Sequence, residues 1–222
     1  GHGQIEGFRE KYGMEYQRAY WDEKPDQYLV DRHRWAIFPL LKMRHLFSEC
    51  KYFQLFDVMN GDNVEQSVYA FTNGDDSQMT LVLYNNRFEH TEGRIYTSAP
   101  KLNKENHQLE TVSLAQSLRL TMGGRHFTIF RNFSTGLYHL RPSMKFFEDG
   151  FRVSLDGYQT MLLTEIHEIE DIDGIYSRLY NRIGDSGVAD INLEIRLMYM
   201  QPFFDVAQKF KDPAFLKALK RV

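Results

Sequence analysis

Between residues 52 and 169 the hydrophobic side chains recur at every second position, and this alternation limits the possible folds more than any other feature. Turn sequences interrupt it, among them Asn60-Gly61 and Asn73-Gly74. Asn and Gly tolerate the positive φ of a tight hairpin turn, so each pair predicts two neighbouring antiparallel strands. Such short strands are typical of a β-sandwich or barrel. We expect strands at residues 52–58, 68–72, 79–84, 127–130, 136–140, 152–155 and 159–166.

The segment before this region has the spacing of a helix. Apolar side chains recur every three to four residues over 26–47, a period that predicts an amphipathic helix. Pro25 suits the first turn of such a helix, because a first-turn residue needs no backbone N–H. Pro39 lies inside the run, so we expect a kink or break near Phe38.

Helical spacing returns after residue 171. We expect helices over 175–183 and 188–200, the second ending at Pro202, and a last helix starting at Asp212-Pro213. Short helical inserts are expected at 113–120 and 143–148. The fold class is therefore mainly β, an antiparallel β-sandwich with flanking N- and C-terminal helices. The predicted division is a helical segment 1–48, a sandwich 49–170 and a helical extension 171–222.

Composition excludes several classes of protein. The formal net charge is −3, which gives no field for attracting nucleic acid. The lone Cys50 excludes an intrachain disulfide or a cysteine-based zinc cluster. No apolar run reaches the ~18 residues of a membrane span. The chain opens with Gly1-His2-Gly3 and shows no secretion signal, so we expect part of a longer protein in the cytoplasm rather than outside the cell.

Signatures of catalysis are missing. The sequence contains no Gly-x-Ser-x-Gly, no phosphate-binding Gly-x-x-x-x-Gly-Lys and no His-Glu-x-x-His. The acidic run 165–173 suggests calcium, but Ile175 and Tyr176 stand where an EF-hand loop needs an oxygen ligand and a glycine. We interpret the run as a strand end leading into a helix start. No catalytic residue, metal site or cofactor is predicted, and the substrate-binding residues stay open.

Other features have structural and functional interpretations. Asn132-Phe133-Ser134 is a glycosylation sequon that we interpret as a turn, and the basic, aromatic C-terminal segment 203–221 as a helix docking on the parent protein. Exposed aromatic rings can bind sugars, and the candidate platforms are Tyr84, Tyr96 and Tyr138. A glycosidase needs two carboxylates about 5–10 Å apart in a cleft. The N-terminal acids that are frequent enough to supply such a pair are Glu6, Glu10, Glu15, Asp22 and Glu23.

The first forty residues resemble a known family. The motifs His2-Gly3-Gln4-Ile5-Glu6-Gly7-Phe8 and Glu10-Lys11-Tyr12-Gly13-Met14-Glu15-Tyr16 resemble the end of the catalytic barrel in a bacterial subgroup of the alpha-amylase family of glycoside hydrolases. The resemblance continues through Arg18-Ala19-Tyr20, Arg32-His33-Arg34 and Ile37-Phe38-Pro39-Leu40-Leu41. Weaker similarity follows at Phe130-Arg131, Thr135-Gly136-Leu137 and Tyr158-Gln159.

The resemblance implies an arrangement and a role. In this family an antiparallel β-sandwich called domain C follows the last barrel strand and helix. The reactive Asp and Glu residues lie on earlier barrel strands, which have no counterpart here, so the chain alone should be inactive. His2, Gln4 and Glu6 would lie at or after the final strand, near the face where barrel enzymes do their chemistry.

The leading hypothesis is a non-catalytic accessory region of a glycosidase acting on alpha-glucans, with the catalytic barrel as its partner. An isolated chain would expose Ile37, Leu40, Leu41 and Phe47 and form a homodimer through them. The alternative is a carbohydrate-binding module for starch- or glycogen-like glucans. A third hypothesis, a stand-alone hydrolase, requires a carboxylate pair within this chain.

Overall fold

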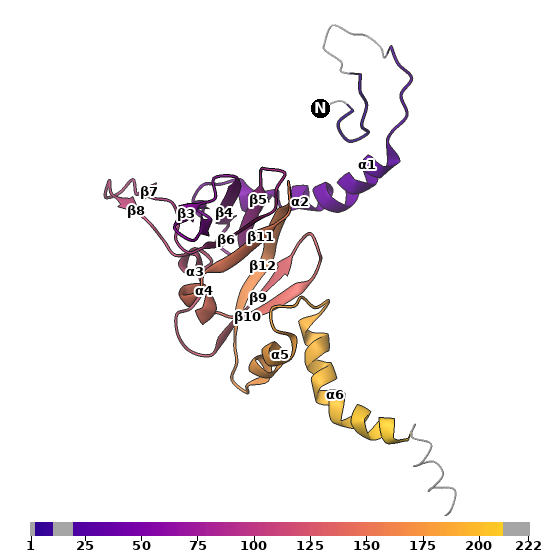
Figure 1. Cartoon of the computed structure of the whole chain (residues 1–222), viewed down its shortest axis with the longest axis vertical. Helices are drawn as coiled ribbons and strands as arrows, with labels where there is room; N and C mark the ends of the chain where they lie inside the picture. The colour runs from indigo at the N-terminus through magenta and orange to yellow at the C-terminus, as the bar shows by residue number, and fades with distance from the viewer. Residues whose placement is uncertain (1–2, 11–19, 211–222) are drawn as a thin grey trace, which may run out of the picture. The chain divides into compact units, whose positions relative to one another are not determined.

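The computed structural model describes residues 3–10 and 20–210 of the chain. By its internal contacts the chain divides into two compact units, residues 1–50 and 51–222 (Figure 1).

The first unit contains an almost continuous helix. It consists of α1 (Gln27–Arg32), a π-helical turn (His33–Ile37) and α2 (Phe38–Lys42), and a 3-10 turn follows at Arg44–Phe47. The Asp26 carboxylate caps α1 by accepting from the Leu29 amide at 3.2 Å. Pro25 therefore precedes the cap. The sequence had suggested a place in the first helical turn instead.

The irregularity expected near Phe38 takes the form of the π-turn. Pro39 has no N–H to donate to the carbonyl four residues earlier, and its ring would collide with that carbonyl in a regular helix. This turn of the helix contains one residue more than a regular α-helical turn, and the Phe38 amide donates to the His33 carbonyl. The helix therefore passes the proline without ending.

The second unit is built from two main antiparallel sheets. The larger has six strands in the order β1-β4-β5-β12-β9-β10, and the smaller has four in the order β11-β6-β2-β3. The strands of the larger sheet are β1 (Gln54–Phe56), β4 (Val68–Gly74), β5 (Met79–Asn85), β9 (His126–Asn132), β10 (Tyr138–Pro142) and β12 (Thr160–Glu170). The smaller sheet contains β2 (Met59–Asn60), β3 (Asn63–Val64), β6 (Thr91–Ile95) and β11 (Phe151–Leu155).

The remaining elements are short, apart from two C-terminal helices. A small hairpin of β7 (Lys101–Leu102) and β8 (Leu109–Glu110) projects from the unit at the upper left of Figure 1. The short helices are α3 (Leu114–Ser117) and α4 (Met144–Glu148), and the C-terminal ones are α5 (Ile175–Ile183) and α6 (Ile191–Lys209).

The core lies between the two sheets. Leu81 and Leu83 of the larger sheet and Val153 and Leu155 of the smaller one are fully buried in it. A second, smaller core covers the other face of β9 and β10, where Leu140 packs with Leu179 of α5 and Ile191 of α6. The expected antiparallel, sandwich-like β-fold is therefore present, and its last helices form a third layer.

One predicted turn lies elsewhere in the structure. Asn73 and Gly74 are the last residues of β4, where they pair with Thr80 and Met79. The turn instead uses 75–78, because the Asp75 carboxylate accepts from the Ser77 and Gln78 amides at 2.8 and 2.9 Å. By contrast, Gly61 follows Asn60 in the tight turn between β2 and β3 and has φ of +60°.

The C-terminal helices also differ from the prediction. Val188 does not begin a helix, because its amide and carbonyl pair with Tyr138 at 2.8 Å. Helix α6 starts after the cap Asp190 and runs through Pro202 to Lys209, although we expected it to end at the proline. The helix expected at 212–216 lies outside the described residues.

Candidate functional site

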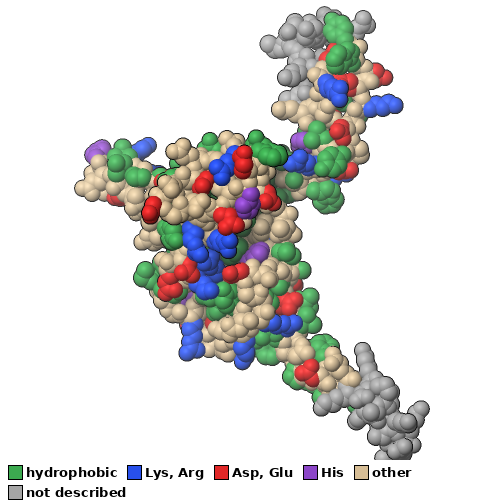
Figure 2. Space-filling model, viewed as in Figure 1, with side chains coloured by type: hydrophobic (Ala, Val, Ile, Leu, Met, Phe, Trp, Pro, Cys, Tyr) green, Lys and Arg blue, Asp and Glu red, His purple; other side chains and the backbone are tan. Residues whose placement is uncertain are grey.

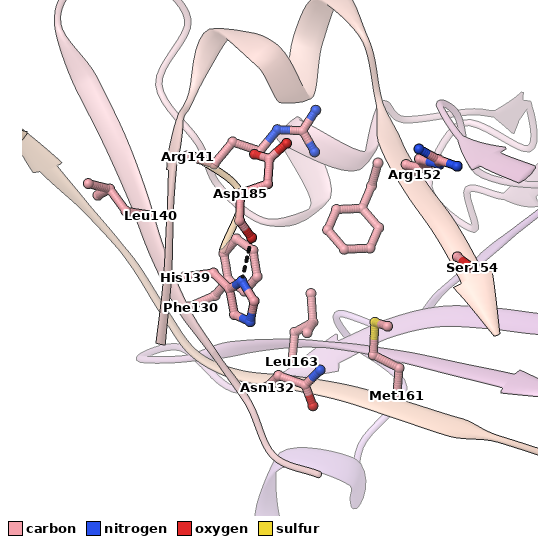
Figure 3. A pocket seen from close by; sticks show the side chains of 11 residues that line it. Phe130, Asn132, His139, Leu140, Arg141, Arg152, Ser154, Met161, Leu163 and Asp185 are labelled. Carbon is pink, nitrogen blue, oxygen red and sulfur yellow. Dashed lines mark hydrogen bonds between the residues drawn. The ribbon is translucent and has the colours of Figure 1, made fainter. Parts of the chain in front are cut away.

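The main candidate site is a pocket of about 450 Å³ between β9, β10 and β11 (Figure 3). Strands β10 and β11 are each the last strand of their sheet, so the pocket lies at an open edge of the sandwich. Its volume is in the range usual for small-molecule sites. The lining combines aromatic, apolar and charged side chains: Phe130, Asn132, His139, Leu140, Arg141, Phe151, Arg152, Ser154, Met161, Leu163 and Asp185.

Strand register brings the central side chains to one face. Phe130 of β9 pairs directly with His139 of β10, and their rings stack with centroids 5.3 Å apart and planes 7° apart. Arg141 lies two residues after His139 and so points to the same side of the sheet. Leu140, between them, belongs to the core beneath the helices.

Three phenylalanines pack together at the apolar side of the pocket, and two of them, Phe130 and Phe151, line it. The Phe130 ring stands edge-on to Phe146 and Phe151, with centroids 6.3 Å away in both cases. Phe146 and Phe151 stack on each other at 6.1 Å. All three rings are buried, so they give the pocket a rigid inner surface.

Arg141 is the charged group set deepest against these rings. Its guanidinium carbon lies 4.9 Å from the Phe146 ring centroid, a cation–π contact. Its Nε is buried without a hydrogen-bond partner among the described residues. Burial lowers the pKa of Arg141, and the nearby Asp185 carboxylate and Tyr180 oppose that change. Figure 3 shows the Arg141 and Asp185 side chains directed toward each other.

His139 is held by the loop after α5. Its Nδ1 donates to the Asp185 carbonyl oxygen at 3.2 Å, which fixes the ring plane over Phe130. Gly187 lies against the ring, because a Cβ on that residue would be 2.9 Å from His139 Nε2. The other imidazole nitrogen, Nε2, makes no hydrogen bond to a described residue.

The opposite side of the pocket is open to solvent. The Arg152 side chain is 65% exposed, and it donates to the Glu92 carboxylate at 3.0 Å. Arg94, which lines the adjoining hollow with Arg152, donates to the Asp149 carbonyl at 2.8 Å. In Figure 2, Lys and Arg side chains gather near the middle of this face with Asp and Glu around them.

A second pocket contains two carboxylates on the helix-covered side of the sheet. Glu165 stands at a bulge in β12 with φ of +53° and accepts from Tyr138 Oη at 2.7 Å and Arg131 Nη1 at 3.2 Å. The hydrogen bond to Glu165 is the largest cause of the raised pKa of Tyr138. The other acid, Asp190, accepts the Asn192 and Leu193 amides at the start of α6. Both carboxylates therefore act as acceptors in structural contacts.

The N-terminal acids also have structural partners. Glu23 accepts from the Arg9 and Glu10 amides, each at 3.0 Å, and Glu10 accepts from the Tyr20 and Trp21 amides. The Glu6 carbonyl accepts from the Asp26 amide at 2.8 Å. Glu15 and His2 lie outside the described residues. The carboxylate contacts of Glu10 and Glu23 therefore hold the loops around residues 9–23.

The acidic run 165–173 joins β12 to α5, as interpreted from the sequence. Buried Asp171 accepts from the Tyr176 and Ser177 amides, and Asp173 from the Ile175 amide. In the part of the chain that the structure describes, no group of three or more His, Cys, Asp or Glu is placed to hold a metal ion. The sequon residue Asn132 accepts from the Ser134 amide at 3.0 Å, a turn contact.

The three predicted aromatic platforms differ in their surroundings. Tyr138 is half-buried and bonded to Glu165, whereas Tyr96 is 42% exposed beside the hollow that contains Arg152. Tyr84 stacks on Tyr69 of the neighbouring strand, with centroids 6.4 Å apart and planes at 12°. Tyr69 is 51% exposed, so this pair presents aromatic surface on the larger sheet. Sequence alternation placed Tyr84 on a strand but did not identify Tyr69 as its partner.

Sequence reasoning did not predict the Arg141 pocket. Its residues come from five separate segments, and the Phe130–His139 pairing depends on the register of β9 with β10. An arginine flanked by Leu140 and Pro142 in a strand was the only local signal.

Comparison of the chain with models of protein families, with curated proteins and with solved structures found no match. No described helix has the length and apolarity needed to cross a membrane.

Proposed function

We propose that this chain is a non-catalytic accessory region of an alpha-amylase-family glycosidase that acts on alpha-glucans. The family assignment rests on the sequence motifs between residues 2 and 41. The structural observation that supports the accessory role is the exposed apolar surface of the first unit. The exposed fractions are 78% for Tyr28, 76% for Trp35, 42% for Ile37 and 58% for Leu41.

Exposed rings of this size on a helix favour a partner surface. In the proposed enzyme that partner is the catalytic barrel. Covering a few hundred Å² of such surface would stabilise the assembly by several kcal/mol at about 25 cal/mol per Å², as an upper bound. The acids of the Glu165 pocket are bound to structural partners, which agrees with a role outside the chemistry.

Activity of the purified chain tests this proposal. We expect no hydrolysis of maltooligosaccharides or of a nitrophenyl glucoside at any pH from 4 to 9. A stand-alone hydrolase would turn over one of these substrates and would lose that activity in Glu165→Gln or Asp190→Asn. Such a result would contradict the accessory role.

A second candidate function, glucan binding, is favoured by the stacked Tyr69–Tyr84 pair. Two nearly parallel rings on a sheet suit successive pyranose rings, whose C–H faces pack on aromatic surfaces. Affinity electrophoresis in amylopectin or glycogen gels tests it. Binding would slow the chain, and Tyr69→Ala would restore its mobility. Tyr158→Ala, which removes a ring 58% exposed on a loop, would not. Unchanged mobility of the unmodified chain in both gels would leave only the accessory role.

A further inference from the structure

We propose that the pocket over Phe130 binds a small organic anion, with its carboxylate or phosphate on the Arg141 guanidinium and its ring or apolar body against Phe151 and Met161. This site is separate from the surfaces invoked above, and the inference stands whether or not the proposed function holds. Nothing in the sequence motifs suggested it.

The first step of the argument is the state of Arg141. A guanidinium carries five N–H donors, and buried donors are normally satisfied. Arg141 donates to no described residue, and its Nε is buried. A buried N–H of a charged group without an acceptor costs free energy of folding. Because the Arg141 Nε lies beside a cavity, this cost favours a ligand that supplies the missing acceptor atom. Carboxylate and phosphate match the planar fork of the guanidinium best.

The second step is the shape of the pocket. The bottom of the pocket is apolar and shielded from solvent, because the Phe130 and Leu163 side chains are only 6% and 2% exposed. The entrance of the pocket is open to solvent, because Arg152 and Ser154 are exposed on β11. In Figure 3 Arg141 enters from the β10 side, with Met161 and Leu163 across the cavity from it. A ligand with one charged end and one apolar end fits this division.

The third step is the balance of charge. The lining contains two guanidiniums, Arg141 and Arg152, and one carboxylate, Asp185, while Glu92 is already paired with Arg152. Arg94 adds positive charge close to Arg141. Positive charge therefore exceeds negative charge around the pocket, which favours an anion over a cation.

Binding can be measured at Met161, because its methyl group lines the pocket. The whole chain would carry ¹³C-methyl methionine, and Met161→Leu would identify the resonance. We expect phenyl phosphate to shift the Met161 signal saturably and to leave that of Met122, which is 73% exposed outside the lining, unchanged. Benzoate, glucose 6-phosphate and inorganic phosphate, titrated in parallel, distinguish carboxylate from phosphate and an aromatic from a sugar body.

Variants test the role of the guanidinium. Arg141→Gln should weaken phenyl phosphate binding about tenfold or more, as expected for a lost charge-assisted contact. Arg178→Gln removes the same charge from an exposed position on α5 and should leave binding unchanged. No Met161 shift with any of the anions at 10 mM would overturn the proposal, and so would equal affinity of Arg141→Gln and the unmodified chain.

If Arg141→Gln fails to fold, a neutral ligand can test anion recognition on the unmodified chain. Benzyl alcohol offers a similar ring without the charge, so it should bind the unmodified chain at least tenfold more weakly than phenyl phosphate. Equal affinity for the two would show an apolar cavity without anion recognition, contrary to the proposal.

Discussion

Two charged side chains in this fold, the buried Asp171 and the half-buried Arg141, have opposite surroundings. Asp171 is fully buried and accepts from the Tyr176 and Ser177 amides at 2.9 and 3.0 Å and from Ser177 Oγ at 2.5 Å. Arg141 makes no hydrogen bond to a described residue. The first arrangement stabilises the start of α5, and the second leaves binding capacity beside a cavity.

Replacing Asp171 should destabilise the second unit. Asp171→Ala leaves buried amides without acceptors, so the free energy of unfolding should fall by about 1–3 kcal/mol in urea denaturation. Asp173→Ala removes a single contact from an exposed residue and should change it by less. Equal effects of the two substitutions would contradict the capping role.

The same residue predicts a dependence on pH. Burial by itself would raise the pKa of Asp171, but the hydrogen bonds from Ser177 and the backbone outweigh it, and the folded-state pKa is lowered. Stabilisation by this group is therefore present above the unfolded-state pKa of about 3.9 and lost as pH falls through the lower, folded value. Between pH 5 and 2, Asp171→Ala should lose less stability than the unmodified chain.

His90 provides a second titration test, at the surface. Hydrogen bonds to Asp156 and Glu92 raise its pKa above the usual 6.5. Proton NMR should find its midpoint higher than 6.5 and lower again in Asp156→Asn. Asp62→Asn, an exposed acid elsewhere, should leave the midpoint in place. An unchanged midpoint in Asp156→Asn would rule out the contact as the cause.

For the secondary-structure elements, the sequence predicted whether a segment is a helix or a strand better than it predicted the residues at which the element begins and ends. The alternation at 68–72 and 79–84 correctly gave the hairpin of β4 and β5, because one face of each strand is buried. Its turn was misplaced, since the Asp75 carboxylate organises the backbone after Asn73-Gly74. The bulge at Glu165 could not be predicted from the sequence, because it depends on the register between β12 and β9.

Pro202 allows a test at this scale. Its ring removes one hydrogen bond within α6, at a cost of up to about 3 kcal/mol in a helix interior. Pro202→Ala should therefore slow amide hydrogen exchange over the neighbouring turns of α6. Val206→Ala, at an exposed position of the same helix, should not. Faster exchange in Pro202→Ala would show that the proline supports the helix.

For the whole molecule, the sequence predicted the layered β-fold but not how the C-terminal helices join it. The residues 171–210 looked like an extension, yet α5 and α6 bury Leu140 of the sheet. That packing decides which face of β10 stays open and so forms the Arg141 pocket. The pocket could not be predicted, because it requires the register and the layers together.

The exposed helix of the first unit predicts self-association of the isolated chain. Sedimentation velocity at increasing concentration should show a monomer–dimer equilibrium, because Trp35 and Leu41 lack cover. Leu41→Glu should shift it toward monomer. Leu102→Glu, at an exposed leucine of the small hairpin, should not. A monomer at all concentrations up to 100 μM would argue against an apolar docking surface.

The central proposal is that this chain supports the catalytic barrel of an amylase-family glycosidase. Sequencing the transcript upstream of the first codon tests it most directly. We expect an open reading frame encoding barrel strands that carry the reactive Asp and Glu residues. A start codon immediately before Gly1, preceded by stop codons in frame, would contradict it.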